Sequence, residues 1–94
     1  MTEANKLESA AEMLKAIAHP VRIAIVEMLS SDKQLNVTEI YESLKIEQAA
    51  ASHHLSILKN KGVLLSERSG KNCIYSLKHQ RISQIIECID KCQH

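Results

Sequence analysis

The chain contains no phenylalanine and no tryptophan, and it has only two tyrosines. A core must therefore be built from leucine, isoleucine, valine, alanine and methionine, which suits the packing of helices. With 94 residues and an apolar fraction of 45%, the sequence excludes a disordered tail and predicts a single domain over residues 1–94. Because so short a chain closes only a thin core, we expect it to share apolar surface with a second copy.

Other absences exclude whole classes of protein. Two glycines leave no room for a glycine-rich loop that cradles phosphates, and no Asp, Glu and His residues cluster, so an enzyme and a cofactor are not expected. No apolar run approaches the roughly 20 residues of a membrane span. Residues 1–6 lack the basic start and the apolar core of a signal peptide. We therefore expect a cytoplasmic protein, in which an odd number of cysteines, three, stay reduced.

The overall charge of +1 hides an uneven distribution along the chain. Residues 1–42 carry a net charge of −3, residues 43–81 a net charge of +5, and residues 82–94 a net charge of −1. A basic middle segment is typical of an element that meets phosphates, although lysines on a solvated face would give the same count.

Apolar spacing predicts five helices, over about residues 4–18, 20–30, 38–44, 48–60 and 79–92. Pro20 suits the first position of the second helix, and Asn36 or Thr38 is expected to cap the third. Gly62 fits the left-handed position after the fourth helix. Residues 63–68 and 71–77 read as a β-hairpin with Ser69 and Gly70 at its basic tip.

This order of elements indicates a winged helix-turn-helix, a mainly α fold with a β-hairpin. It would have five helices, a two-stranded wing over about residues 63–77 and a recognition helix over about residues 48–60 that lies in the major groove of DNA. The first and last helices remain free to pack against a second copy, which predicts a homodimer.

Two motifs, in this order and spacing, resemble a known family. The first reads Ala18-His19-Pro20-x-Arg22-x-x-Ile25-x-x-x-Leu29, and the second reads Ser52-x-His54-Leu55-x-x-Leu58-x-x-x-Gly62-Val63-Leu64. Both are similar to the ArsR/SmtB family of bacterial winged-helix repressors, and the resemblance covers roughly residues 7–90. It implies a homodimer that binds a palindromic operator in double-stranded DNA and that an effector releases.

The predicted DNA contacts fall into two groups. Gln48 and Ala49 open the recognition helix and would sit at the groove, where small side chains allow close approach, and Ser52, His53 and Ser56 on its outer face are the best candidates for reading base edges. Candidates for phosphate contacts are basic: Lys59, Lys61, Arg68 and Lys71. His54 is assigned to the scaffold because the inward-facing Leu55 and Leu58 are its neighbours. Arg22 is left open between a phosphate contact and an internal pair with a carboxylate.

The family resemblance also suggests where an effector site could lie. A thiol site on the third helix is excluded, because Leu35-Asn36-Val37-Thr38-Glu39-Ile40 contains no cysteine. At the site on the last helix, His79, Arg81 and Cys92 occupy three of the ligand positions, and an arginine repels cations. No metal site of either known kind is therefore expected.

Cys88 and Cys92 lie four residues apart, hence on one face of the last helix. Two interpretations stay open: a thiol site that responds to a soft metal, arsenite or an oxidant, or two small apolar side chains at the dimer seam. Cys73 in the hairpin is expected to be structural.

The main alternative function is a winged-helix protein-interaction module without DNA binding. Such modules tend to lose the basic hairpin tip and the polar outer face of the helix, whereas this chain keeps Arg68, Lys71 and its Ser-His-Ser face.

Overall fold

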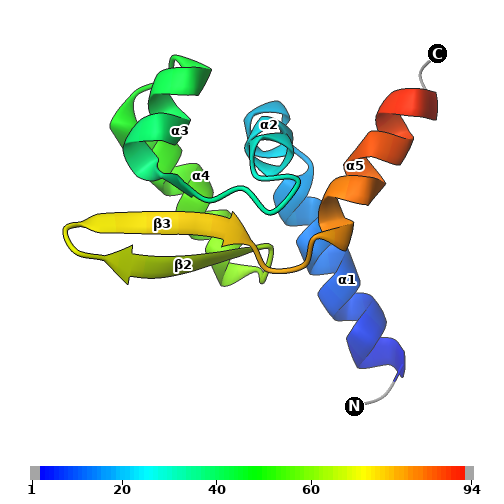
Figure 1. The fold of residues 1–94 in the computed structure, drawn as a ribbon. Coiled ribbons are helices and arrows are strands. Elements are labelled where there is room, and N and C mark those ends of the chain that lie inside the picture. The colour runs from blue at the N-terminus through cyan, green and yellow to red at the C-terminus, as the bar shows by residue number, and fades with distance from the viewer. Residues whose placement is uncertain (1–2, 93–94) are drawn as a thin grey trace.

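Five helices and a small antiparallel sheet follow one another in the order expected from the sequence (Figure 1). The structure, a computed structural model, describes residues 3–92, so the two residues at each end of the predicted domain 1–94 lie outside the described residues. The elements are α1 (Glu3–Ile17), α2 (Pro20–Met28), β1 (Leu35–Asn36), α3 (Val37–Leu44), α4 (Gln48–Asn60), β2 (Leu64–Ser69), β3 (Asn72–Leu77) and α5 (Arg81–Cys92). The predicted winged helix-turn-helix architecture is confirmed.

The wing differs from the prediction in having a third strand. Two residues, Leu35 and Asn36, pair with Tyr75 and Ile74, so the sheet order is β1-β3-β2. A two-residue strand gives no readable alternation in the sequence, which is why it was missed. The hairpin turn also lies one residue later than expected, since Ser69 pairs with Asn72 and leaves Gly70 and Lys71 at the tip.

Local sequence explains where the two middle helices begin and end. Asn36 accepts the backbone N–H of Glu39, and the Glu39 carboxylate accepts the backbone N–H of Asn36, a reciprocal capping box that starts α3. Lys45 ends this helix in the left-handed conformation, at a φ of 56°. Gly62 follows α4 at a φ of 80°, as the sequence predicted.

The last helix begins at Arg81, two residues later than predicted. The sheet explains the delay, because the backbone N–H of Lys78 still bonds to the carbonyl of Val63 beyond the end of β3. His79 and Gln80 are then needed to turn the chain. Gln80 also accepts the backbone N–H of Asp32, which ties this turn to the loop after α2.

The core is entirely aliphatic, as the lack of Phe and Trp required. Its fully buried side chains come from α2, α3, α4 and β2 and from the residues that follow α2 and precede β2, and the largest are Ile25, Val26, Leu29, Ile40, Leu55, Leu58, Val63 and Leu64. No charged or polar side chain of residues 5–92 is buried with them. The core therefore packs α4 against α2, α3 and the sheet through aliphatic side chains.

Candidate nucleic-acid interface

Helix α4 has one buried face and one exposed face. Ala51, Leu55 and Leu58 are completely buried. The five predicted DNA contacts in the body of the helix all lie on the exposed side: Gln48, Ala49, Ser52, His53 and Ser56. The structure therefore brings them together on one exposed face of α4.

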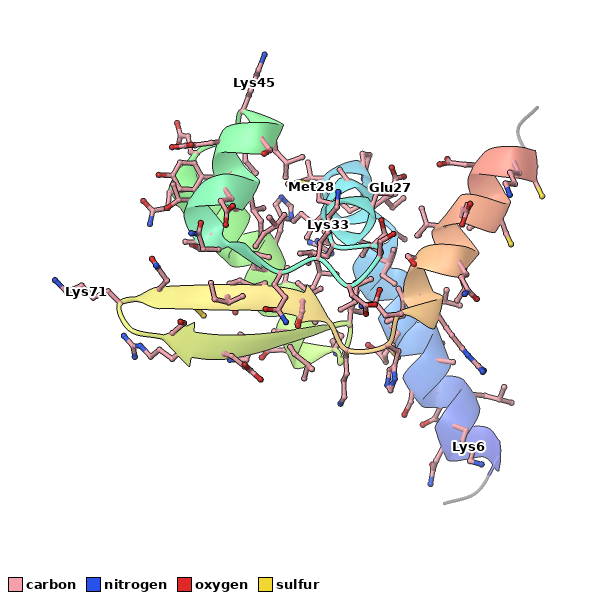
Figure 2. All side chains as sticks on the ribbon, in the orientation of Figure 1. Lys6, Glu27, Met28, Lys33, Lys45 and Lys71 are labelled. Atoms are coloured by element: carbon pink, nitrogen blue, oxygen red, sulfur yellow. The ribbon has the colours of Figure 1, made fainter. Side chains whose placement is uncertain are left out.

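Basic side chains flank this helix at several points. Lys59 is exposed in the last turn of α4, and Arg68 and Lys71 are exposed on the wing. Figure 2 shows Lys71 projecting from the tip of the wing and Lys45 projecting from the turn between α3 and α4. Lys45 belongs to the basic segment of the sequence but is not among the predicted phosphate contacts. Its position just before the recognition helix could have identified it as a further candidate.

Lys61, predicted as a phosphate contact, has an internal partner. Its Nζ lies 3.1 Å from Oε2 of Glu12 on α1, and both side chains are about half exposed. Lys61 thus belongs to the contact between α1 and the end of α4, and it would have to leave Glu12 to reach a phosphate.

Arg22 does not pair with a carboxylate, which was one of the two contacts left open by the sequence. Its Nε donates to Nδ1 of His54 at 3.1 Å, and its Nη1 donates to the carbonyl oxygen of Ala16, also at 3.1 Å. The guanidinium therefore links the end of α1, the start of α2 and the middle of α4. The sequence could not reveal this link, because Arg22 and His54 lie 32 residues apart.

Two further histidines surround His54. The ring centroid of His19 lies 4.8 Å from that of His54, and the ring of His53 lies at 5.9 Å. Nδ1 of His19 accepts the backbone N–H of Val21 and so caps α2. The pKa of His54 is lowered, first by desolvation and then by the charges of His19, Arg22 and His53, so the neutral ring is favoured.

A second surface, apolar rather than basic, lies on α1 and α5. Leu7, Leu14, Ile85 and Ile89 are between 48% and 70% exposed, although they are large aliphatic side chains. Between the two helices runs a groove of about 440 Å³, with Leu14, Ile17, Ile82 and Ile89 among its lining residues. Figure 1 shows that these helices lie at the end of the molecule away from the tip of the wing.

Cys88 and Cys92 are exposed near the end of α5, and Cys73 is half-buried in β3. All three are free thiols. Within residues 3–92, no three or more His, Cys, Asp or Glu side chains gather in a way that could hold a metal ion. A soft metal at Cys88 and Cys92 would therefore need ligands from outside this set. Nor is any helix of the described segment long and apolar enough to cross a membrane.

Comparison with known proteins agrees with this geometry. A family model described as "Bacterial regulatory protein, arsR family" matches residues 19–66. The chain is 40% identical over 87 residues to the transcriptional repressor PagR of Bacillus anthracis, an alignment that covers 93% of this chain and 87% of that protein. It is 42% identical over 80 residues to the HTH-type transcriptional repressor SmtB of Mycobacterium tuberculosis, covering 85% of this chain and 58% of SmtB.

Solved structures show the same fold. The crystal structure of PagR matches with a TM-score of 0.83, over 93% of this chain and 99% of that one. Mb0332 of Mycobacterium bovis, described as a homodimeric winged helix-turn-helix DNA-binding domain, matches with a TM-score of 0.83 over 99% of this chain and 87% of that one. At 21% identity the second match supports the fold alone.

Proposed function

The chain belongs to the ArsR family of bacterial regulatory proteins, and we propose that it is a transcriptional repressor that binds a palindromic operator as a homodimer. In this proposal, residues 1–94 act as one DNA-binding domain in the cytoplasm. Helix α4 lies in the major groove, and the wing reaches the flanking DNA. The PagR and SmtB relatives are named as repressors, which supports repression rather than activation.

The division of α4 into two faces is the observation that carries the proposal. A helix held by three completely buried side chains, with hydroxyl and imidazole groups on its outer side, offers donors and acceptors to base edges. Ser52, His53 and Ser56 would read bases, and the small Ala49 near the start of the helix would allow close approach. An interaction module without DNA binding has no need of this polar face.

The exposed cations supply the electrostatic part of binding. Lys59, Arg68 and Lys71 would contact phosphates on either side of the groove and so fix the register of the protein on the duplex. Lys61 would contribute only after it leaves Glu12.

The apolar surface of α1 and α5 supports the homodimer. It places large aliphatic side chains in water on a chain of this size, and a second copy would cover them. A twofold axis through this surface would leave both recognition helices free, and a palindromic operator would match the two copies.

The thiols of Cys88 and Cys92 are proposed as the effector site. Both are exposed and lie on one face of α5, next to the proposed dimer surface, so oxidation or arsenite binding there would disturb the pairing of the two copies. The competing interpretation, two small side chains that only pack at the dimer seam, predicts no response to either reagent.

Selection of duplexes from a random pool tests the main proposal. A palindromic sequence should be enriched, and its affinity should fall linearly with the logarithm of salt concentration, because phosphate contacts release counterions. Failure to bind any duplex at low salt would overturn the repressor and favour the interaction module.

A further inference from the structure

One hydrogen bond of Arg22 replaces a backbone hydrogen bond that is missing between α1 and α2. In a continuous helix the carbonyl of Ala16 would accept the N–H of residue 20, but that residue is a proline and has none. Nη1 of Arg22 donates to this carbonyl instead, at 3.1 Å. The same guanidinium donates through Nε to Nδ1 of His54 on α4. The corner between α1 and α2 is thereby connected to the recognition helix.

We propose that Arg22 is a positioning residue for DNA recognition, which fixes the placement of α4 against the corner between α1 and α2 through a bond that exists only while His54 is neutral. This inference rests on the proposed DNA-binding function of α4. It assigns Arg22 and His54 no contact with DNA.

The geometry favours positioning over a direct phosphate contact. Arg22 and His54 are both half-buried, and two of the three guanidinium nitrogens of Arg22 are already engaged. Since apolar packing leaves a helix some freedom to rotate and slide, a bond of fixed direction adds what the aliphatic core does not supply. His54 lies one residue after His53 and two after Ser52, so a rotation of α4 at this point would move both predicted base contacts.

His54 must be neutral because Nδ1 accepts the bond. Protonation would remove the lone pair and place a second cation beside the guanidinium. The surroundings oppose protonation: desolvation lowers the pKa of His54 most, and the charges of His19, Arg22 and His53 lower it further. The other ionisable side chains of the elements packed on α4 are not among these causes: Lys6, Glu8, Glu12 and Lys15 of α1, Glu27 of α2, Glu39, Tyr41 and Glu42 of α3, and Glu67 and Arg68 of β2.

Acid should therefore release α4. At a pH above about 6.5 His54 is neutral in the folded and the unfolded chain, and its bond to Arg22 is fully present. As the pH falls below this value the unfolded chain takes up the proton first, so stability declines until the folded state is protonated as well. The bond itself is lost when the folded state takes up the proton, at a pH below 6.5 because the pKa of His54 is lowered.

Hydrogen exchange of the DNA-free protein tests the link without relying on DNA binding. In Arg22→Met and in His54→Phe, protection of the α4 amides around Leu55 should fall about tenfold at pH 7.5, the effect of losing one charge-assisted bond. His54→Asn keeps an acceptor near the position of Nδ1 and cannot be protonated, so its protection should stay high as the pH is lowered from 7.5 through the acid range, whereas wild-type protection should fall. Arg68→Met on the wing is the matched control and should change nothing.

Operator binding at fixed salt then separates positioning from contact. Arg22→Met should weaken binding about tenfold without changing the salt dependence, and His54→Phe should add little to it in the double variant. Arg22→Lys should not restore affinity, because one ammonium cannot make two bonds of fixed direction.

Each alternative has its own outcome. If Arg22→Met lowers the salt slope by about two per dimer, or if Arg22→Lys binds as wild type does, Arg22 is a phosphate contact and the inference is overturned. Unchanged α4 protection in both Arg22→Met and His54→Phe also overturns it. If the wild-type protein binds no duplex, the proposed function fails and positioning for DNA recognition fails with it, while the exchange data still report whether the link holds α4. A melting curve for each variant confirms that it is folded, and Arg22→Met alone tests the loss of the bond if His54→Phe does not fold.

Discussion

Nζ of Lys61 lies 3.1 Å from Oε2 of Glu12, so an ion pair joins the end of the recognition helix to α1. A hydrogen bond from Lys61, then its charge, and then the charge of Lys15 lower the pKa of Glu12. The carboxylate thus holds a lysine that the sequence assigned to a phosphate. Whether Lys61 contacts DNA depends on which anion it prefers.

Removing Glu12 tests that competition. Glu12→Gln should raise operator affinity several-fold and increase the salt slope by about two per dimer, because two lysines become free for phosphates. Glu8→Gln removes the same charge one turn away on α1 and is the matched control for long-range electrostatics. Equal effects of the two variants, in titrations over a range of salt, would show that Lys61 stays away from the DNA.

Ser52 and His53 should determine sequence preference. The double variant Ser52→Ala and His53→Ala should lose roughly 2 kcal/mol or more of discrimination between the operator and a scrambled duplex, since base contacts supply that difference. Both side chains are exposed, so the melting temperature and the dimer should be unaffected. A variant that fails to fold would instead place these residues in the scaffold.

Lys59, Arg68 and Lys71 should act on all sequences alike. Replacing any one of them with Gln should weaken operator and scrambled duplexes by the same factor and reduce the salt slope by about two per dimer. Lys6 on α1 lies at the far end of the molecule from Lys71 (Figure 2), so Lys6→Gln is the control and should leave the slope unchanged. A loss confined to the operator would mean that the replaced residue reads bases.

The surface of α1 and α5 should hold the dimer together. Ile89→Glu places a charge where a partner would bury an aliphatic side chain, and it should raise the dimer dissociation constant roughly a hundredfold in sedimentation equilibrium. Leu65, 45% exposed on β2, gives a matched control, because Leu65→Glu adds the same charge on the wing. Dissociation caused by Leu65→Glu and not by Ile89→Glu would move the interface to the wing.

The thiols of α5 are tested by release from DNA. Arsenite or a mild oxidant should release the wild-type protein in gel shifts, and Cys88→Ser and Cys92→Ser should each remain bound. Cys73→Ser, with its half-buried thiol on β3, should respond as wild type does. Release that is identical in all three variants would leave Cys88 and Cys92 as packing residues.

Much of the fold could be predicted from the sequence because the residues that start and end its helices act locally. Pro20 begins α2, Asn36 caps α3 and Gly62 follows α4, and each does so through bonds or backbone angles within a few residues. The predictions were wrong where contacts with an element far away in the sequence determine the local structure. The late start of α5 depends on the bond between Lys78 and Val63, and β1 exists only because β3 lies beside it.

The sequence by itself determined the aliphatic core, the order of the elements and the exposed polar face of α4, because apolar periodicity and turn chemistry act over short range. Only the tertiary structure decided which partners the charged side chains take. Lys61 pairs with Glu12, and Arg22 bonds to the carbonyl of Ala16 and to His54, and all three contacts join separate helices. Long side chains find such partners through the packing of helices, and a linear pattern does not encode that proximity.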